Sequence, residues 1–128
     1  MGRLQLRPTD GELAILRVLW ERGPSTVRQV HEALAGTRDT GYTTTLKLMQ
    51  IMADKGLVKR NETARTHVYA ASAGEEQTQQ QLVQDLVDRA FGGSAAALVL
   101  RALSAEGTSE SELREIRKLI DDYREKQS

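Results

Sequence analysis

The sequence contains no cysteine, so disulfide bridges and metal sites built on thiolates are excluded. No run approaches the ~18 consecutive apolar residues that a membrane-spanning helix needs. The first seven residues are polar and basic, without the apolar segment of a secretory signal. There is also no internal repeat. These absences favour a cytoplasmic protein that folds in a reducing environment and does not insert into a membrane.

The motifs of common enzyme classes are missing as well. There is no cysteine nucleophile, no glycine-rich phosphate-binding loop and no HExxH zinc motif. The two histidines, His31 and His67, lie 36 residues apart, and neither has a carboxylate at the spacing of a zinc protease. His31 stands among apolar residues of a predicted helix, where a partly exposed surface position is the simplest interpretation. We expect no catalytic residues, no metal and no cofactor.

What the chain does have is a charge asymmetry. Its formal net charge is zero, with 28% charged and 39% hydrophobic residues, which is typical of a folded protein. Residues 1–71 carry eleven Lys and Arg against seven Asp and Glu, a net charge of +4. Residues 72–128 carry seven against eleven, a net charge of −4. This split suggests a phosphate-facing module joined to a module with another role, although chance fluctuation could also produce it.

Capping residues predict two helices near the beginning of the chain. Thr9 can cap a helix, and Glu12, three residues later, can complete a capping box. Apolar residues at helical spacing follow until Gly23-Pro24 ends the helix. Ser25 or Thr26 then begins a second helix, which is expected to end near residue 36.

A third helix is predicted from Tyr42 to Lys55, with Gly56 as its C-terminal cap. Positions i, i+3, i+4 and i+7 form its buried stripe: Thr45, Leu48, Met49 and Met52. Two β-type runs follow, 57–60 and 66–70, with a polar turn between them. Three helices and a hairpin in this order indicate a winged helix-turn-helix.

From Glu75 onward the pattern is helical, with breaks at Gly92-Gly93 and Gly107 and possible helix caps at Ser94 and Ser109. The predicted fold is therefore mainly α: a winged helix-turn-helix of three helices plus a β-hairpin wing, then a three-helix C-terminal dimerisation region. We place the DNA-binding domain at residues 1–72 and the helical dimerisation domain at residues 73–128.

The C-terminal helices are too short to bury their apolar stripes by themselves. A second copy of the chain is the simplest cover, since most soluble oligomers are two-fold dimers. Packing of these helices back onto the N-terminal domain is the alternative. The residues expected at a homodimer interface are Leu82, Leu86, Phe91, Leu98, Leu103, Leu113, Ile116, Ile120 and Tyr123.

The third helix carries residue types that suit double-stranded DNA. In a helix-turn-helix, the N-terminal residues of the second helix of the pair meet base edges in the major groove. Hydroxyls and a helix N-terminus hold phosphates, Lys donates to guanine, and Gln pairs with adenine. The candidate contacts are Arg28, Tyr42, Thr43, Thr44, Leu46, Lys47 and Gln50 in the helices, and Arg60, Arg65 and His67 in the hairpin. An ordinary solvated helix face is the alternative for each of the residues in the third helix.

Two other kinds of function stay open at this point. A winged helix can serve only protein–protein contacts, although the basic Arg60 and Arg65 argue against that use. A DNA-binding regulator can also carry a small-molecule effector. The thin C-terminal half leaves little room for a pocket of ~300 Å³ or more, which weakens this second alternative.

Six segments resemble the BlaI/MecI family of transcriptional repressors, also called penicillinase repressors: residues 9–20, 26–34, 42–45, 55–60, 67–69 and 91–100. The resemblance implies a winged helix whose homodimers bind palindromic operators near a promoter and block transcription. It implies that residues 42–51, Ile51 included, line the major groove. It further implies that the hairpin between Arg60 and His67 contacts the DNA backbone.

The resemblance also implies how repression ends. Members of the family are relieved by proteolysis in the dimerisation region, triggered by a membrane metalloprotease that senses β-lactam antibiotics. The matching position here is Arg101-Ala102, where the best-known members have Asn-Phe. Ile51 also stands where relatives often carry Arg. Copper-responsive relatives end in a cysteine cluster, and the absence of cysteine excludes that switch.

Overall fold

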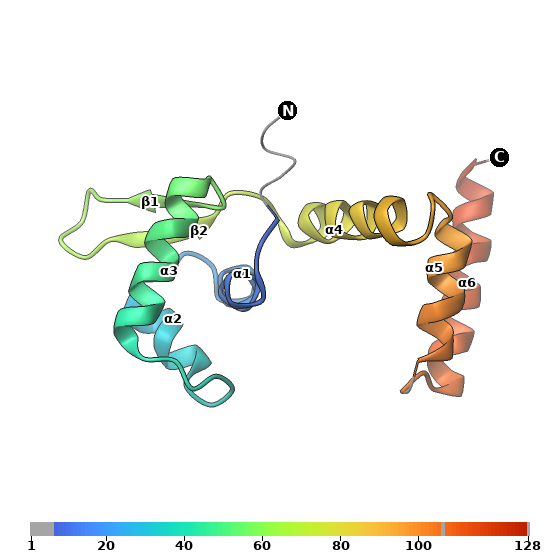
Figure 1. The fold of residues 1–128 in the computed structure, drawn as a ribbon, viewed down its shortest axis with the longest axis horizontal. Coiled ribbons are helices and arrows are strands. Elements are labelled where there is room, and N and C mark those ends of the chain that lie inside the picture. Colours follow the sequence, from blue (N-terminus) through green and yellow to red (C-terminus); the bar gives the residue numbers. More distant parts are fainter. Residues whose placement is uncertain (1–6, 106, 128) are drawn as a thin grey trace. The chain divides into compact units, whose positions relative to one another are not determined.

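The computed structural model describes residues 7–105 and 107–127, and over these it forms six helices and one β-hairpin (Figure 1). The chain divides into two compact units, the first ending at Leu82 and the second beginning at Val83. The elements are α1 (Asp10–Arg22), α2 (Val27–Leu34), α3 (Tyr42–Lys55), β1 (Val58–Asn61), β2 (Val68–Ala71), α4 (Glu75–Ala90), α5 (Ala95–Ser104) and α6 (Glu110–Gln127). The predicted mainly helical fold is confirmed, and the proposed domain boundary at residues 72 and 73 stays a prediction.

The first two helices begin at capping boxes. The Thr9 hydroxyl accepts from the Glu12 N–H at 3.2 Å, and the Glu12 carboxylate accepts from the Thr9 N–H at 2.9 Å. Thr26 and Gln29 form the same reciprocal pair at the start of α2. Of the two residues considered for the second cap, Thr26 takes the role. The backbone of Ser25 instead pairs with Tyr69 of the hairpin.

The third helix has the predicted bounds. It ends at Lys55, and Gly56 adopts φ 87°, a left-handed conformation that glycine adopts without a side-chain clash. The predicted stripe faces inward: Thr45, Met49 and Met52 are buried, and Leu48 packs half-buried against the core. The opposite face of α3 is therefore left for contacts outside this unit.

The hairpin is antiparallel, and Arg60 lies opposite Tyr69 in its register. Pairing begins and ends later than the predicted runs, since β1 spans 58–61 and β2 spans 68–71. Asn61 ends the first strand. Its side-chain oxygen accepts from the N–H of Thr63 at 3.0 Å and from its hydroxyl at 2.7 Å, so the chain turns there. His67, which we expected within the second strand, lies instead in the loop.

The core of the first unit lies where α1, α2, α3 and the hairpin meet. Its buried apolar side chains are Ile15, Leu16, Val18, Leu19, Val27, Val30, Met49, Met52, Val58 and Tyr69. Beside this core, the Trp20 indole N–H donates to the backbone oxygen of Ala73 at 2.9 Å. This bond fixes the chain to α1 just after β2, before α4 begins.

The second unit has little core of its own. Ser94 and Ser109 cap α5 and α6, as predicted, by accepting from the N–H groups of Ala97 and Glu112. Neither of these two helices contains a buried residue. Exposed large apolar side chains in this unit include Val83, Leu86, Val99, Leu100, Leu113, Leu119, Ile120 and Tyr123. No helix within residues 7–105 and 107–127 is long and apolar enough to span a membrane.

Candidate nucleic-acid interface

The exposed face of α3 carries the predicted polar residues. Thr44, Lys47 and Gln50 are all exposed, and Tyr42 and Thr43 are exposed at the beginning of the helix. The N-terminal cap position is Gly41, which has no side chain to bond the first N–H groups of α3. Free N–H groups at a helix N-terminus favour phosphate oxygens. Hydroxyl donors, a cation and an amide thus lie next to a site suited to an anion.

Two apolar candidates lie at the edges of this face. Ile51 is exposed, whereas Leu46 is half-buried and packs against the core. The Leu46 side chain therefore helps to hold α3 against the core, and only its exposed part is available to a thymine methyl group.

A contact between α2 and α3 involves one residue that we had not assigned to the site. The Arg28 guanidinium carbon lies 5.2 Å from the centre of the Tyr42 ring, a cation–π distance. The His31 ring meets the same tyrosine edge-on, with centroids 5.8 Å apart and planes at 86°. Arg28 and His31 are three residues apart and so share one face of α2. This spacing was visible in the sequence, but the contact of both side chains with Tyr42 of α3 was not.

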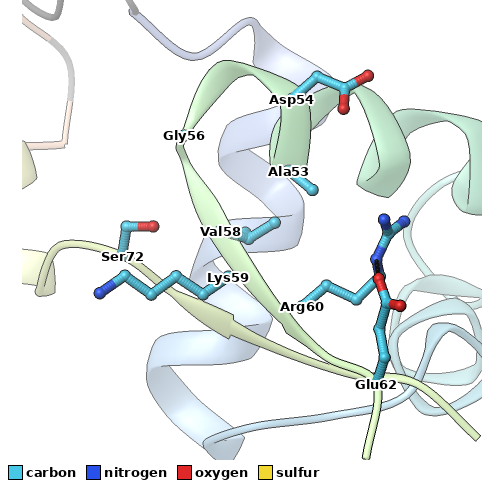
Figure 2. A pocket seen from close by; sticks show the side chains of 8 residues that line it. All are labelled: Ala53, Asp54, Gly56, Val58, Lys59, Arg60, Glu62 and Ser72. Carbon is cyan, nitrogen blue, oxygen red and sulfur yellow. Dashed lines mark hydrogen bonds and ion pairs between the residues drawn. The ribbon is translucent and has the colours of Figure 1, made fainter.

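The hairpin places its basic residues around its tip. Arg60, Arg65 and His67 are all exposed. Arg60 has a partner that the sequence did not indicate: its Nε donates to a Glu62 carboxylate oxygen at 2.6 Å. The Tyr69 hydroxyl and then the Glu62 carboxylate raise the pKa of the Arg60 guanidinium, so this side chain stays charged. Figure 2 shows Arg60 and Glu62 together, whereas Lys59 points the other way, towards Ser72.

An open hollow of about 500 Å³ lies beside the hairpin (Figure 2). Its lining residues are Ala53, Asp54, Gly56, Val58, Lys59, Arg60, Glu62 and Ser72. Acidic and basic side chains both line it, so it has no single charge with which to select a ligand. In the part of the chain that the structure describes, no three His, Cys, Asp or Glu side chains come together as a metal site.

Backbone hydrogen bonds hold the hairpin against the helix-turn-helix. The Ser25 N–H donates to the Tyr69 oxygen at 2.9 Å, and the Tyr69 N–H donates to the Ser25 oxygen at 2.8 Å. Ser25 directly precedes the Thr26 cap of α2, so β2 pairs with β1 on one side and with this segment on the other. The basic tip and the exposed face of α3 thus belong to one connected framework.

A largely buried ion pair sets the position of α3 against α1. Lys55 Nζ lies 3.1 Å and 2.8 Å from the two Glu12 carboxylate oxygens. Burial raises the pKa of the Glu12 carboxyl, but the hydrogen bonds from Lys55 and Thr9 outweigh it and lower this pKa below 4.5. The pair joins the first turn of α1, which carries Glu12, to the last turn of α3, which carries Lys55. Helix dipoles favour a negative charge at the N-terminus and a positive charge at the C-terminus, so both helices favour this arrangement.

The residues expected in the C-terminal half divide by exposure. Leu86, Leu113, Ile120 and Tyr123 are exposed, whereas the other predicted interface residues are half-buried: Leu82, Phe91, Leu98, Leu103 and Ile116. Arg101 and Ala102, the expected cleavage position, are exposed within α5.

Three helices, a basic hairpin and an outward polar face on the third helix define the winged helix-turn-helix class of DNA-binding proteins. The family profile described as penicillinase repressor matches residues 8–122. The chain therefore belongs to the penicillinase repressor family. It is a DNA-binding transcriptional repressor of the BlaI type and not an enzyme.

Three individual proteins are similar to this chain. The transcriptional regulator BlaI of Mycobacterium tuberculosis is 37% identical over 105 residues, which cover 80% of this chain and 76% of that protein. The penicillinase repressor of Bacillus licheniformis is 20% identical over 116 residues, 91% of each chain. A solution structure of the DNA binding domain of the repressor BlaI aligns with a TM-score of 0.47 and 22% identity, covering 52% of this chain and 82% of that one.

Proposed function

We propose that this repressor acts as a homodimer on a palindromic operator, with α3 of each subunit in a major groove. The observation that carries the proposal is the two-sided character of α3. One side is buried in the core and carries Thr45, Met49 and Met52. The opposite side is exposed and carries Lys47 and Gln50, and the helix N-terminus has no side-chain cap. A polar, positively charged face on a helix anchored from behind suits insertion into a groove.

Within this arrangement the candidate residues take different roles. Lys47 donates to guanine and Gln50 pairs with adenine, so these two read bases. Leu46 and Ile51 border the groove and touch thymine methyl groups. The remaining candidates hold phosphates and fix the register without reading sequence: Arg28, Tyr42, Thr43, Thr44, Arg60, Arg65 and His67.

The uncovered apolar residues of the second unit support a homodimer. α5 and α6 bury no residue within one chain, and Ile120 and Tyr123 are more than half exposed at 51% and 65%. A second copy covers such surface in a two-fold arrangement and holds two α3 helices about one DNA turn apart. Residues 73–128 then form the dimerisation domain and residues 1–72 the DNA-binding domain of a cytoplasmic regulator.

Release of the operator is part of the proposal. We assign it to an inducing signal such as proteolysis after Arg101 by a membrane metalloprotease sensor, which would place the chain in an antibiotic response. Arg101 and Ala102 are exposed, and α5 contains no buried residue. Local opening of such a helix costs little free energy, so a protease can reach its backbone. Cleavage there separates α6 from the rest of the chain and weakens the dimer.

The test is to select bound duplexes from a random library with the full chain and to measure affinities by gel shift. Lys47→Ala should weaken binding to the selected operator at least roughly tenfold, because each base contact contributes about 1–3 kcal/mol and a dimer loses two of them. Lys126→Ala in α6 removes the same charge far from the proposed contacts along the chain and should leave the affinity unchanged. Failure of the wild-type chain to retard any duplex at low salt would overturn the proposal.

A further inference from the structure

The hairpin presents Arg60 in a fixed way. Arg60 lies opposite Tyr69, whose backbone N–H and oxygen both bond to Ser25. These groups therefore point away from β1, so Arg60 and Tyr69 form a non-hydrogen-bonded cross-strand pair, the kind whose side chains lie closest. The Tyr69 ring is 1% exposed and is held in the core. Arg60 thus lies beside an aromatic side chain that is anchored in the core.

The Arg60 guanidinium already has a carboxylate partner within the hairpin, Glu62. The Asn61 side chain bonds both the N–H and the hydroxyl of Thr63, which fixes the turn that contains Glu62. The Glu62 carboxylate lies 2.6 Å from Arg60 Nε, and the two side chains are 53% and 33% exposed (Figure 2). The pair faces solvent at the part of the hairpin where the proposed function places the DNA backbone.

Folding alone does not account for this pair. Ion pairs between exposed side chains contribute little to stability. A carboxylate and a phosphate, however, both fit the guanidinium of arginine as hydrogen-bond acceptors. A DNA phosphate that approaches Arg60 must displace Glu62 or remain beside its negative charge. Either way, the hairpin holds DNA less strongly than its basic residues alone would predict.

On the basis of the proposed function, we infer that Glu62 competes with DNA phosphate for Arg60 and so lowers the affinity of the hairpin for DNA of any sequence. Binding to random sequence depends almost entirely on phosphate contacts, whereas operator binding also draws on base contacts from α3. A weaker phosphate contact lowers both affinities by a similar factor, and random-sequence complexes, which have no base contacts to hold them, then dissociate fastest. Glu62 keeps the repressor from being held on DNA that lacks the operator.

The test uses the full chain, with fluorescence anisotropy on a selected operator and on a random-sequence duplex over a range of salt concentrations. Glu62→Gln should tighten binding to the random duplex by about threefold to tenfold per dimer. Its log–log salt slope should become steeper by about 0.9 per subunit, because Arg60 then neutralises a phosphate without giving up a carboxylate. A structural effect on the turn would not move this slope in that direction.

Two control variants separate the pair from bulk charge. Glu21→Gln removes the same charge from an exposed position on α1 and should change the affinity less than about twofold. In an Arg60→Gln background, Glu62→Gln should have no effect beyond that of Glu21→Gln. An equal gain in that background, or unchanged or weaker random-duplex binding by Glu62→Gln alone, would overturn the inference. Absence of duplex binding by the wild-type chain would overturn the proposed function itself.

Discussion

Replacing Glu12 with glutamine tests how α1 holds α3 in place. The Glu12 side chain is 2% exposed, and the Lys55 ammonium lies within hydrogen-bonding distance of both its oxygens. Glutamine keeps an oxygen for the Thr9 N–H, but it removes the charge and replaces the oxygen 2.8 Å from Lys55 Nζ with an NH2 group that cannot accept. Breaking a buried ion pair costs about 3–5 kcal/mol, but Lys55 is 33% exposed and can turn to water. We therefore expect a loss of about 2 kcal/mol at pH 7, or roughly 8 to 16 °C in Tm.

The reverse replacement should cost more. Lys55→Met leaves the Glu12 carboxylate buried without its cation, and this group cannot reach water as lysine can. We expect a loss of about 3 kcal/mol for Lys55→Met, and a double variant less destabilised than the sum of the two. Urea unfolding followed through Trp20, the single tryptophan, reports on this unit because its indole bonds the Ala73 oxygen. A larger loss for Glu12→Gln than for Lys55→Met would refute the reasoning.

The pH dependence gives a second check on the same pair. The pKa of Glu12 is lower in the folded chain than its ordinary value of 4.5, so the native state stabilises the ionised carboxylate. This contribution is fully present above about pH 4.5 and disappears as the pH falls through the lowered pKa. The difference in unfolding free energy between wild type and Glu12→Gln should therefore narrow below that pH. A difference that stays constant from pH 7 to pH 3 would contradict the ion pair.

Three further outcomes follow from the proposed interface. If each subunit neutralises roughly three to four phosphates, a dimer should show a log–log salt slope of roughly −5 to −7 in DNA binding, and a slope near zero would contradict the electrostatic part of the proposal. Arg65→Ala should weaken operator and random duplexes about equally, whereas Lys47→Ala should weaken the operator most; affinity measurements on both duplexes distinguish them. A chain that ends at Leu82 should sediment as a monomer beside a dimeric full-length chain, and persistent dimers would place the interface in the first unit.

Local sequence signals predicted the helices well. Thr9 and Thr26 each have a Glu or Gln three residues later, and this spacing by itself supports a reciprocal cap. Gly56 marked the end of α3 for a similar reason, because the left-handed conformation there suits glycine. The outward face of α3 was predictable from the same periodicity that buried its other side. Each of these signals depends on interactions between residues within about one helical turn.

The contacts that the sequence did not reveal join distant residues or depend on a turn. Lys55 and Glu12 are 43 positions apart, and no local pattern pairs them. The Ser25–Tyr69 bridge and the contact of Tyr42 with Arg28 also require the folded arrangement. Arg60 and Glu62 are two residues apart, a spacing that places side chains on one face of a strand, but β1 ends at Asn61 and Glu62 lies in the turn beyond it. The position of the Glu62 carboxylate therefore depends on the turn that the Asn61 side chain holds, which the sequence pattern did not specify.

The bridge between Ser25 and Tyr69 has a consequence for how fast and how tightly duplexes are captured. Because the hairpin is already secured to the chain that enters α2, docking needs little ordering of the backbone in the first unit. The association rate is then governed by diffusion and electrostatic steering rather than by a folding step. Less of the interaction free energy is then spent on ordering the protein.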